Sequence, residues 1–222
     1  MLACVNVGKA YPSDRGTVEA VRGIDLDVPR GQFVAVVGRS GSGKSSLMAM
    51  IGGLSRPTRG TVFVEDVDIW ALPEGRLAVF RSCEIGFVFQ FPSLLPTLRI
   101  IDNVALPALL ARQLDTDAAY RKAGELLDRL DLAGHIDAYP SEISSGEQRR
   151  AVIARALVNS PSLLLADEPT ADLDEQTENE IVEQLRDLNR NENLTLLMVT
   201  HNLRLAEQAH RVVHIADGRI LP

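Results

Sequence analysis

The stretch Gly38-Arg39-Ser40-Gly41-Ser42-Gly43-Lys44-Ser45 decides the fold of this chain, because it fits the pattern G-x-x-x-x-G-K-[ST]. Glycines at these positions let successive backbone N–H groups curl around a polyphosphate. Lys44 supplies a point charge for the β- and γ-phosphates, and the Ser45 hydroxyl is suited to Mg²⁺. The motif therefore predicts a site for nucleotide phosphates and a divalent cation.

The segments on either side of the loop support this prediction. Residues 32–37 form a short, apolar, β-branched run of the kind buried in a parallel sheet, and residues 46–51 are apolar and helix-prone. Strand, glycine loop and helix follow in the order that a phosphate-binding loop requires. Because a helix N-terminus adds its dipole and free N–H groups to an anion site, Ser46 joins the expected binding residues.

The composition limits the class of protein. Its 222 residues, 45% hydrophobic and 24% charged, are enough for one sizeable core with a smaller subdomain. The net charge is −7, whereas nucleic-acid-binding proteins are usually basic overall, so no nucleic-acid partner is expected. No apolar run approaches the ~20 residues of a membrane helix, and the start lacks a signal-peptide pattern. We expect a soluble protein that reaches a membrane only through a partner.

Hydrophobic patterning predicts an α/β fold. Residues 1–30 alternate apolar and polar positions, as antiparallel strands with one solvated face do. Further strands are expected at residues 60–64, 85–91, 163–166 and 194–199, and a hairpin with a turn at Asp217-Gly218 ends the chain. In the strand at 85–91, alternate phenylalanines share one face: Phe87, Phe89 and Phe91. Helices are expected at residues 102–106, 118–130, 146–158 and 175–189.

The order of these elements predicts one domain, residues 1–222. A P-loop NTPase core, with a parallel sheet and an N-terminal antiparallel β subdomain, covers residues 1–90 and 161–222. A helical subdomain at 91–160 interrupts that core. Such sheets bind ligands at the carboxyl ends of their strands, where the motifs of the core fall.

One apolar strand, at residues 163–166, ends in two acids, Asp167 and Glu168. Carboxylates at a strand end beside a phosphate loop suit Mg²⁺ and water. We predict that Asp167 holds the metal, directly or through water, and that Glu168 orients or deprotonates the attacking water. An acidic loop without chemistry is the alternative for these two residues, and the upstream phosphate loop disfavours it.

The segment Ile143-Ser144-Ser145-Gly146-Glu147-Gln148 opens a predicted helix. Ser144 with Glu147 three residues later fits an ordinary capping box. That interpretation leaves unexplained why a second anion-ready helix start occurs in the same chain.

Taken as a whole, the sequence resembles the nucleotide-binding subunit of ABC transporters, and the resemblance covers nearly all residues in the family's order and spacing. Residues 144–148 look like the family's signature motif, usually Leu-Ser-Gly-Gly-Gln/Glu. The resemblance implies that Ser144 and Gly146 reach the γ-phosphate of ATP held by an opposite subunit, with Ser145 and Glu147 beside them. Two subunits, expected as a homodimer, then sandwich two ATP molecules head to tail.

Other positions match the family as well. Tyr11 resembles the aromatic residue that stacks on adenine, and Gln90 resembles the glutamine that touches Mg²⁺ and water and links the core to the helical insertion. Asp174, in Ala171-Asp172-Leu173-Asp174, resembles part of the D-loop at the dimer interface. His201 resembles the switch histidine on the γ-phosphate. The resemblance thus implies catalytic roles for Lys44, Gln90, Glu168 and His201, and metal ligation by Ser45, Gln90 and Asp167.

The chain departs from the family pattern at three positions. Ser145 stands where the signature usually has glycine, and its Cβ is expected to crowd the phosphate or limit the backbone angles. Ile143 replaces the usual leucine, and Arg39 replaces a common proline and is expected to face solvent. None of these changes removes Lys44, Glu168 or His201, so we predict a subunit that hydrolyses ATP.

A narrower resemblance rests on Gly86-Phe87-Val88-Phe89-Gln90 and Leu94-Leu95-Pro96-Thr97-Leu98. These segments look like the lipoprotein-releasing, macrolide-exporting and cell-division subunits, which work with mechanotransmitting permeases. This implies a place at the cytoplasmic face of the inner or plasma membrane, held there by the permease. We hypothesise that Phe91, Leu94 and Leu95 line the groove for a permease helix; a local core beneath the helical insertion is the alternative.

Other functional classes fit the chain less well. Soluble ABC proteins of translation or DNA repair resemble two fused cassettes or carry long coiled-coil insertions, whereas this chain has one cassette and no heptad run. A P-loop kinase for small molecules would not explain residues 144–148 or Gln90. A non-catalytic, ATP-gated clamp would not require Glu168 and His201. The transported substrate is not encoded in any of these motifs.

Overall fold

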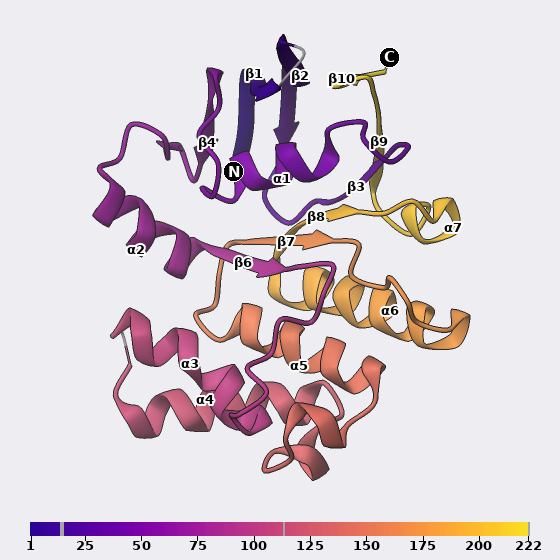
Figure 1. The fold of residues 1–222 in the computed structure, drawn as a ribbon. Coiled ribbons are helices and arrows are strands. Elements are labelled where there is room, and N and C mark those ends of the chain that lie inside the picture. Colours follow the sequence, from indigo (N-terminus) through magenta and orange to yellow (C-terminus); the bar gives the residue numbers. More distant parts are fainter. Residues whose placement is uncertain (14–15, 113, 222) are drawn as a thin grey trace.

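The main sheet positions the predicted motifs, and its strand order is β10-β9-β3-β8-β7-β6 (Figure 1). The computed structural model describes residues 1–13, 16–112 and 114–221. The neighbouring pairs from β9 through β6 all run parallel, and β10 pairs antiparallel at the edge. The strands are β3 (Phe33–Val37), β6 (Ile85–Val88), β7 (Leu163–Asp167), β8 (Thr195–Val199), β9 (Arg211–Ala216) and β10 (Arg219–Ile220).

The central strands are apolar throughout because both faces of the sheet are covered. On β3, Val34 and Val36 face a core shared with helix α1 (Lys44–Ile51), whereas Phe33, Ala35 and Val37 face a second core. That second core is shared with the helices drawn below the sheet in Figure 1. Continuous apolar runs are the expected sequence pattern of parallel strands buried on both sides.

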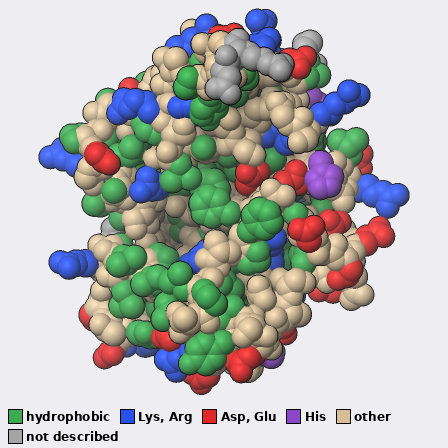
Figure 2. All heavy atoms as spheres, viewed as in Figure 1, with side chains coloured by type: hydrophobic (Ala, Val, Ile, Leu, Met, Phe, Trp, Pro, Cys, Tyr) green, Lys and Arg blue, Asp and Glu red, His purple; other side chains and the backbone are tan. Residues whose placement is uncertain are grey.

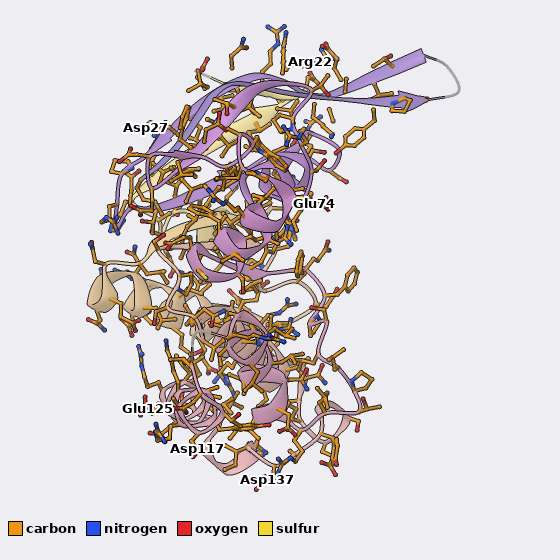
Figure 3. All side chains as sticks on the ribbon, turned by 90° about the vertical axis from the view of Figure 1, so that its left-hand side faces the viewer. Arg22, Asp27, Glu74, Asp117, Glu125 and Asp137 are labelled. Carbon is orange, nitrogen blue, oxygen red and sulfur yellow. The ribbon has the colours of Figure 1, made fainter. Side chains whose placement is uncertain are left out.

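A second sheet, of order β2-β1-β4-β5, is antiparallel and lies across α1 from the main sheet (Figure 1). Its strands are β1 (Leu2–Ser13), β2 (Gly16–Val28), β4 (Arg59–Val64) and β5 (Val67–Asp68). Leu2 and Cys4 are buried, whereas Val5 is exposed, as expected for one solvated face. Seen from the side, the tips of β1 and β2 project beyond the body of the protein (Figure 3). The antiparallel pairing predicted for residues 1–30 is therefore confirmed.

Helices cover the other face of the main sheet. Next to the sheet lie α5 (Ser145–Leu157) and α6 (Glu175–Glu192), and α3 (Ile100–Ala111) and α4 (Thr116–Arg129) form the outermost layer (Figure 1). Short turns, η1 (Ala133–His135) and η2 (Pro140–Glu142), lead into α5, and α7 (Leu203–Ala206) follows β8. Because α5 contacts both β6 and α3, we propose residues 91–160 as the helical subdomain, with α5 as the element that joins it to the core.

Among the elements that differ from the sequence-based expectation are β6 and helix α2 (Glu74–Glu84). The strand predicted at 85–91 ends at Val88, before Pro92 and Pro96, so Gln90 and Phe91 lie outside the sheet. The rings of Phe87 and Phe89 nevertheless stack, with centroids 4.1 Å apart. In addition, α2 forms where no element was expected.

Candidate nucleotide site

A cavity of about 470 Å³ lies at the carboxyl ends of β3, β7 and β8. It brings together segments that are far apart in the sequence: the glycine loop, the acidic strand end, Gln90 and His201. Twelve of the predicted residues line it, together with Ala20 and Val199, which the sequence did not single out. The predicted lining residues are Gly38, Ser40, Gly41, Ser42, Gly43, Lys44, Ser45, Ser46, Gln90, Asp167, Glu168 and His201.

Gly43 shows why the loop needs glycine. Its φ is +102°, a conformation that residues with a Cβ rarely adopt, and a Cβ there would lie 2.2 Å from the carbonyl oxygen of Ala20. Ala20 belongs to β2, so the antiparallel sheet closes one side of the cavity. The following residue, Lys44, begins α1, which places the N-terminus of that helix against the cavity.

Polar groups of the loop turn inward. The buried Lys44 ammonium donates to the carbonyl oxygens of Gly38, at 2.7 Å, and Arg39, at 3.0 Å. The buried Oγ of Ser42 has no hydrogen-bond partner within the described residues. Buried polar atoms are normally satisfied, so a lone hydroxyl beside an ammonium and a helix N-terminus fits a ligand with phosphate oxygens.

The strand-end acid Asp167 lies next to the loop. Burial raises the pKa of its carboxyl, the Ser45 hydroxyl hydrogen-bonded to it lowers that pKa, and the neighbouring Glu168 raises it again. Ser45, Asp167 and Gln90 line one cavity and supply a hydroxyl, a carboxylate and an amide oxygen. In the described part of the chain, no group of three or more His, Cys, Asp or Glu side chains is arranged to hold a metal ion by itself. The oxygen set fits Mg²⁺, which takes one or two carboxylates and completes its shell with phosphates and water.

Glu168 and His201 form a pair at the mouth of the cavity. Oε2 of Glu168 lies 2.9 Å from Nδ1 of His201 and accepts a longer bond, 3.3 Å, from the backbone N–H of the same residue. The Glu168 side chain is 14% exposed, whereas that of His201 is 75% exposed. The carboxylate is therefore held in place, and the imidazole faces the open side.

Two predicted binding residues lie outside the cavity. Tyr11 stands at its rim, where the phenol donates to Oγ of Ser46 at 3.4 Å, and its ring lies under the Lys9 ammonium, 5.1 Å away. Arg39 is exposed, as expected, and lines a separate cavity behind the loop with His214 and Asp217.

The signature-like segment also lies outside the cavity, at the start of α5. The Ser144 hydroxyl accepts from the backbone N–H of Glu147, and the Glu147 carboxylate accepts from the backbone N–H of Ser144, which confirms the capping box. The carboxylate also accepts from the Ser144 hydroxyl, and these bonds lower the pKa of Glu147. Gly146 lies against the start of α6, since a Cβ there would be 2.7 Å from Cγ2 of Thr177. Asp174 caps α6 and accepts from the Thr177 hydroxyl at 2.6 Å. Residues 144–147 are thus absent from the cavity of their own chain.

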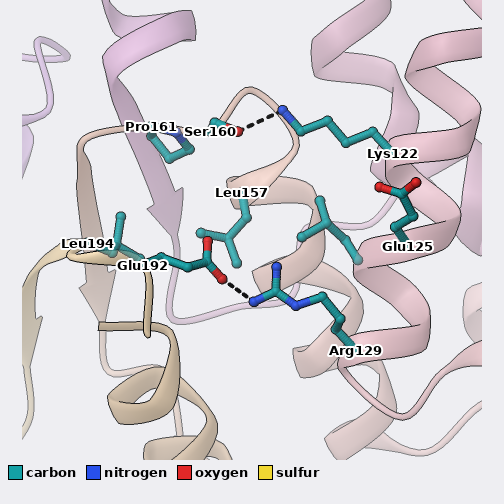
Figure 4. A pocket seen from close by; sticks show the side chains of 9 residues that line it. Lys122, Glu125, Arg129, Leu157, Ser160, Pro161, Glu192 and Leu194 are labelled. Carbon is teal, nitrogen blue, oxygen red and sulfur yellow. Dashed lines mark hydrogen bonds and ion pairs between the residues drawn. The ribbon is translucent and has the colours of Figure 1, made fainter. Parts of the chain in front are cut away.

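A further cavity, of about 210 Å³, separates α4 from the end of α6 (Figure 4). Its polar groups pair with one another: Lys122 donates to Oγ of Ser160, and Arg129 forms an ion pair with Glu192. These contacts join the helical layer to the core, and none of the predicted site residues takes part.

Comparison with known proteins agrees with this architecture. The family model described as ABC transporter matches residues 21–171. The lipoprotein-releasing system ATP-binding protein LolD of Geobacter metallireducens is 45% identical, over 100% of this chain and 98% of that protein. The macrolide export ATP-binding/permease protein MacB 1/2 of Paracoccus denitrificans is also 45% identical, over 97% of this chain but 32% of that longer protein.

Solved structures show the same fold. The ATP-binding cassette MJ0796, solved as a dimer in a post-hydrolysis state with ADP and Pi, superposes with a TM-score of 0.93 at 34% identity. The match covers 100% of this chain and 97% of that one.

Proposed function

The chain belongs to the ABC transporter family, and from this premise we propose that it is the ATPase subunit of a lipoprotein-releasing or macrolide-exporting type of transporter. It is an ATP-binding cassette of the hydrolysing class. One observation carries the proposal: Lys44, Gln90, Asp167, Glu168 and His201 converge on one cavity from separate parts of the chain. A small-molecule kinase or a soluble translation factor would not account for the LolD relatives, which match this chain over 98% and 96% of their own length.

We propose a task for each group that lines the cavity. The loop N–H groups and Lys44 bind the ATP phosphates, and Ser45, Asp167 and Gln90 would hold Mg²⁺, which neutralises charge on the phosphates when bound. Glu168 accepts a hydrogen bond from the attacking water and takes its proton as the water oxygen bonds to the γ-phosphorus and the bond from that phosphorus to the bridging oxygen breaks, which releases ADP. His201 keeps the Glu168 carboxylate in position and presents its ring to the γ-phosphate. Positioning and charge stabilisation supply most of the catalysis.

Hydrolysis by the purified protein tests this proposal. We expect Glu168→Gln to bind ATP normally but to lower kcat by about 100-fold or more, because the amide cannot accept the proton of water. Phosphate release with MgATP measures kcat, and a fluorescent ATP analogue measures binding. Glu74→Gln, on the exposed start of α2, is the matched control and should hydrolyse ATP like the wild type. Near-normal turnover in Glu168→Gln would refute the assignment of Glu168.

We further propose that two copies act on an integral-membrane permease at the cytoplasmic face of the membrane. Within the described residues no helix is long and apolar enough to cross a bilayer. The LolD and MacB names of the relatives favour association through a permease, and the dimeric MJ0796 structure favours two copies.

The surface around the end of β6 is our candidate for permease docking. A groove of about 380 Å³ is lined by Leu54, Phe87, Phe89 and Arg155 among others. Hydrophobic side chains gather on this part of the face in Figure 2. Phe91 is 68% exposed and Leu95 is 44% exposed, whereas Leu94 packs partly into the helical core. The proposed contact therefore centres on Phe91, Leu95 and the neighbouring groove, with Leu94 as support.

Co-purification with the permease from native membranes tests this surface. We expect Phe91→Asp or Leu95→Asp to lose the permease while basal ATP hydrolysis persists, because a desolvated carboxylate opposes docking at an apolar contact. Val18→Asp, an equally exposed site on β2, should retain the permease. Full retention in both groove variants would contradict the assignment.

A further inference from the structure

Arg149 is a buried cation that the motifs do not explain. It lies on α5, three residues after Gly146, and is 2% exposed. Its Nη1 donates to the carbonyl oxygen of Phe89 and its Nη2 to that of Gln90, both at 2.7 Å. These two carbonyls belong to the residues that follow β6, at the point where the chain leaves the sheet.

Stability alone does not account for this arginine. No carboxylate lies within ion-pair distance of Arg149 among the described residues, although the more distant Asp172 acts on it electrostatically. Burying a guanidinium without an ion pair opposes folding, and an apolar side chain would fill the same space more favourably. What the Arg149 guanidinium contributes is two short hydrogen bonds, which hold the consecutive carbonyl groups of Phe89 and Gln90 next to the cavity.

The two hydrogen bonds connect the residues after β6, which border the nucleotide cavity of this chain, to helix α5, whose start would face the nucleotide of a partner subunit. The Gln90 side chain lines the cavity of its own chain, whereas Ser144 and Gly146 begin the helix that carries Arg149. A displacement of the Gln90 backbone would therefore displace Arg149 and, because both lie on α5, residues 145–146 as well.

We propose that Arg149 is a positioning residue that holds Gln90 at the nucleotide and couples it to the start of α5. This inference rests on the proposed ATPase function. It names the side chain that would link the nucleotide cavity of one subunit to residues 144–146, the segment that we expect to face the nucleotide of the partner subunit. Arg149 itself does not line the cavity, so it acts only through the backbone of residues 89–90.

A matched control lies on the same helix. Arg155 donates to the carbonyl oxygen of Ser93 at 2.8 Å and to Oγ of Ser93 at 2.9 Å. It therefore holds the same loop from the same helix, but three residues beyond Gln90. A loss of general loop stability would follow from either substitution, whereas a loss of Gln90 positioning would follow from Arg149 alone.

A double-mutant cycle with Gln90→Ala tests the proposal. We expect Arg149→Met, which removes both hydrogen bonds to the backbone of residues 89–90, to lower kcat about tenfold. The same substitution should change kcat by less than about twofold when Gln90 is already alanine. Arg149→Lys should recover part of the rate, because its ammonium can still donate to one carbonyl. Arg155→Met should have the same effect with and without Gln90. Equal effects of Arg149→Met in both backgrounds would overturn the proposal.

Amide hydrogen exchange gives a readout that does not require activity. We expect residues 85–91 to exchange faster in Arg149→Met than in Arg155→Met, and binding of ATP to restore less protection in the former. Unchanged exchange in Arg149→Met overturns the inference, and Arg149→Lys serves if the methionine variant fails to fold. A wild-type protein that releases no phosphate would reject the proposed ATPase function instead, while the exchange comparison would still decide the role of Arg149.

Discussion

Glu168, the base that we propose, has an unusual backbone conformation. Its φ is +48°, in the left-handed region, and its backbone N–H donates to the carbonyl oxygen of Val199 at 2.9 Å. Such conformations persist only where the surrounding structure enforces them. The contact with His201 adds a second constraint, so the carboxylate points into the cavity before any ligand binds.

Removal of the imidazole tests the value of that constraint. We expect His201→Ala to lower kcat about 10- to 100-fold with little change in ATP affinity, because the carboxylate loses its partner and the γ-phosphate loses a donor. His201→Gln should lie between alanine and wild type. Steady-state phosphate release and equilibrium ATP binding separate the two effects, and a loss confined to affinity would contradict this role.

At Ser145 we expect a substitution to raise the rate of hydrolysis instead of lowering it. It is exposed at the first position of α5, where the family pattern has glycine. If its Cβ crowds the partner's phosphate, Ser145→Gly should raise kcat/KM by about two- to fivefold, equivalent to less than about 1 kcal/mol. The change should lower stability by no more than about 1 kcal/mol, the penalty for glycine in a helix. Equal or lower kcat/KM in the glycine variant would show that the hydroxymethyl group is not an obstacle.

Sequence patterns predicted the side chains that line the cavity, and missed a residue whose hydrogen bonds go to backbone carbonyls. Lys44, Asp167, Glu168 and His201 could be predicted because each lies at a fixed position in a strand-loop pattern. Arg149 could not, because its acceptors are the carbonyls of Phe89 and Gln90, and carbonyls are common to every residue type. The same bonds explain why the predicted strand stops early: those carbonyls face a helix instead of a neighbouring strand.

Among the elements, α2 shows where periodicity fails. Of its eleven residues only Leu77 is buried, and its N-cap, Pro73, makes no side-chain cap hydrogen bond. Neither an apolar stripe nor a capping residue was therefore available to predict it. By contrast, α4 and α6 each have an aspartate cap and several buried positions, and both were predicted within three residues of their bounds.

The start of α5 is fitted to the start of α6, and Gly146 is the point of contact. We expect Gly146→Ala to lower the free energy of unfolding by about 1–3 kcal/mol, because its Cβ would overlap Cγ2 of Thr177. Helix propensity alone predicts the opposite sign, since alanine is the better helix former by up to about 1 kcal/mol.

A second substitution identifies the cause. Thr177→Ser removes Cγ2 but keeps the hydroxyl that donates to Asp174. We therefore expect the double variant to regain most of the lost stability, as measured by urea unfolding. Equal stability of Gly146→Ala and the double variant would mean that the overlap is relieved elsewhere.

The start of α3 depends on one carboxylate. Asp102 accepts from Nε of Arg99 and from the Tyr120 hydroxyl of α4, each at 2.9 Å, and the hydrogen bond from Arg99 is the main cause that lowers its pKa. A pKa lowered by folding adds stability above the ordinary value of the unfolded chain, and that stability disappears as pH falls through the folded pKa.

We expect Asp102→Asn to lower the free energy of unfolding by about 1 kcal/mol at pH 7, a modest value because the group is partly exposed. The difference from wild type should begin to shrink as the pH falls below about 4, the ordinary carboxyl pKa of the unfolded chain, and should continue to shrink until the pH has passed the lower pKa of folded Asp102. Urea unfolding at several pH values measures this, with Asp117→Asn on exposed α4 as the control. A difference that stays constant down to pH 2 would contradict the assignment to this carboxylate.

At the scale of the whole molecule, the nucleotide cavity and the signature-like segment lie in separate parts of the chain. The cavity contains Lys44, Asp167 and Glu168, whereas residues 144–147 lie on the separate helical layer beside α6. Their own chain places no nucleotide cavity next to them. We propose a dimer in which each signature-like segment covers the partner's cavity, and the cassette MJ0796, which has this fold, is itself a dimer.

Charge at position 145 tests that arrangement. In the Glu168→Gln background, which retains ATP, we expect Ser145→Asn to form a dimer with ATP, whereas Ser145→Asp should bind ATP but remain monomeric. Asp and Asn have nearly the same shape. Because an acid in the first turn stabilises a helix, a loss of the dimer in the Asp variant would come from its charge and not from a weaker α5. A carboxylate about 4 Å from a phosphate charge opposes association by about 4 kcal/mol at an effective dielectric constant near 20. Light scattering after size exclusion measures the mass, and dimers of equal stability in the two variants would show that residues 144–147 do not face the partner's nucleotide.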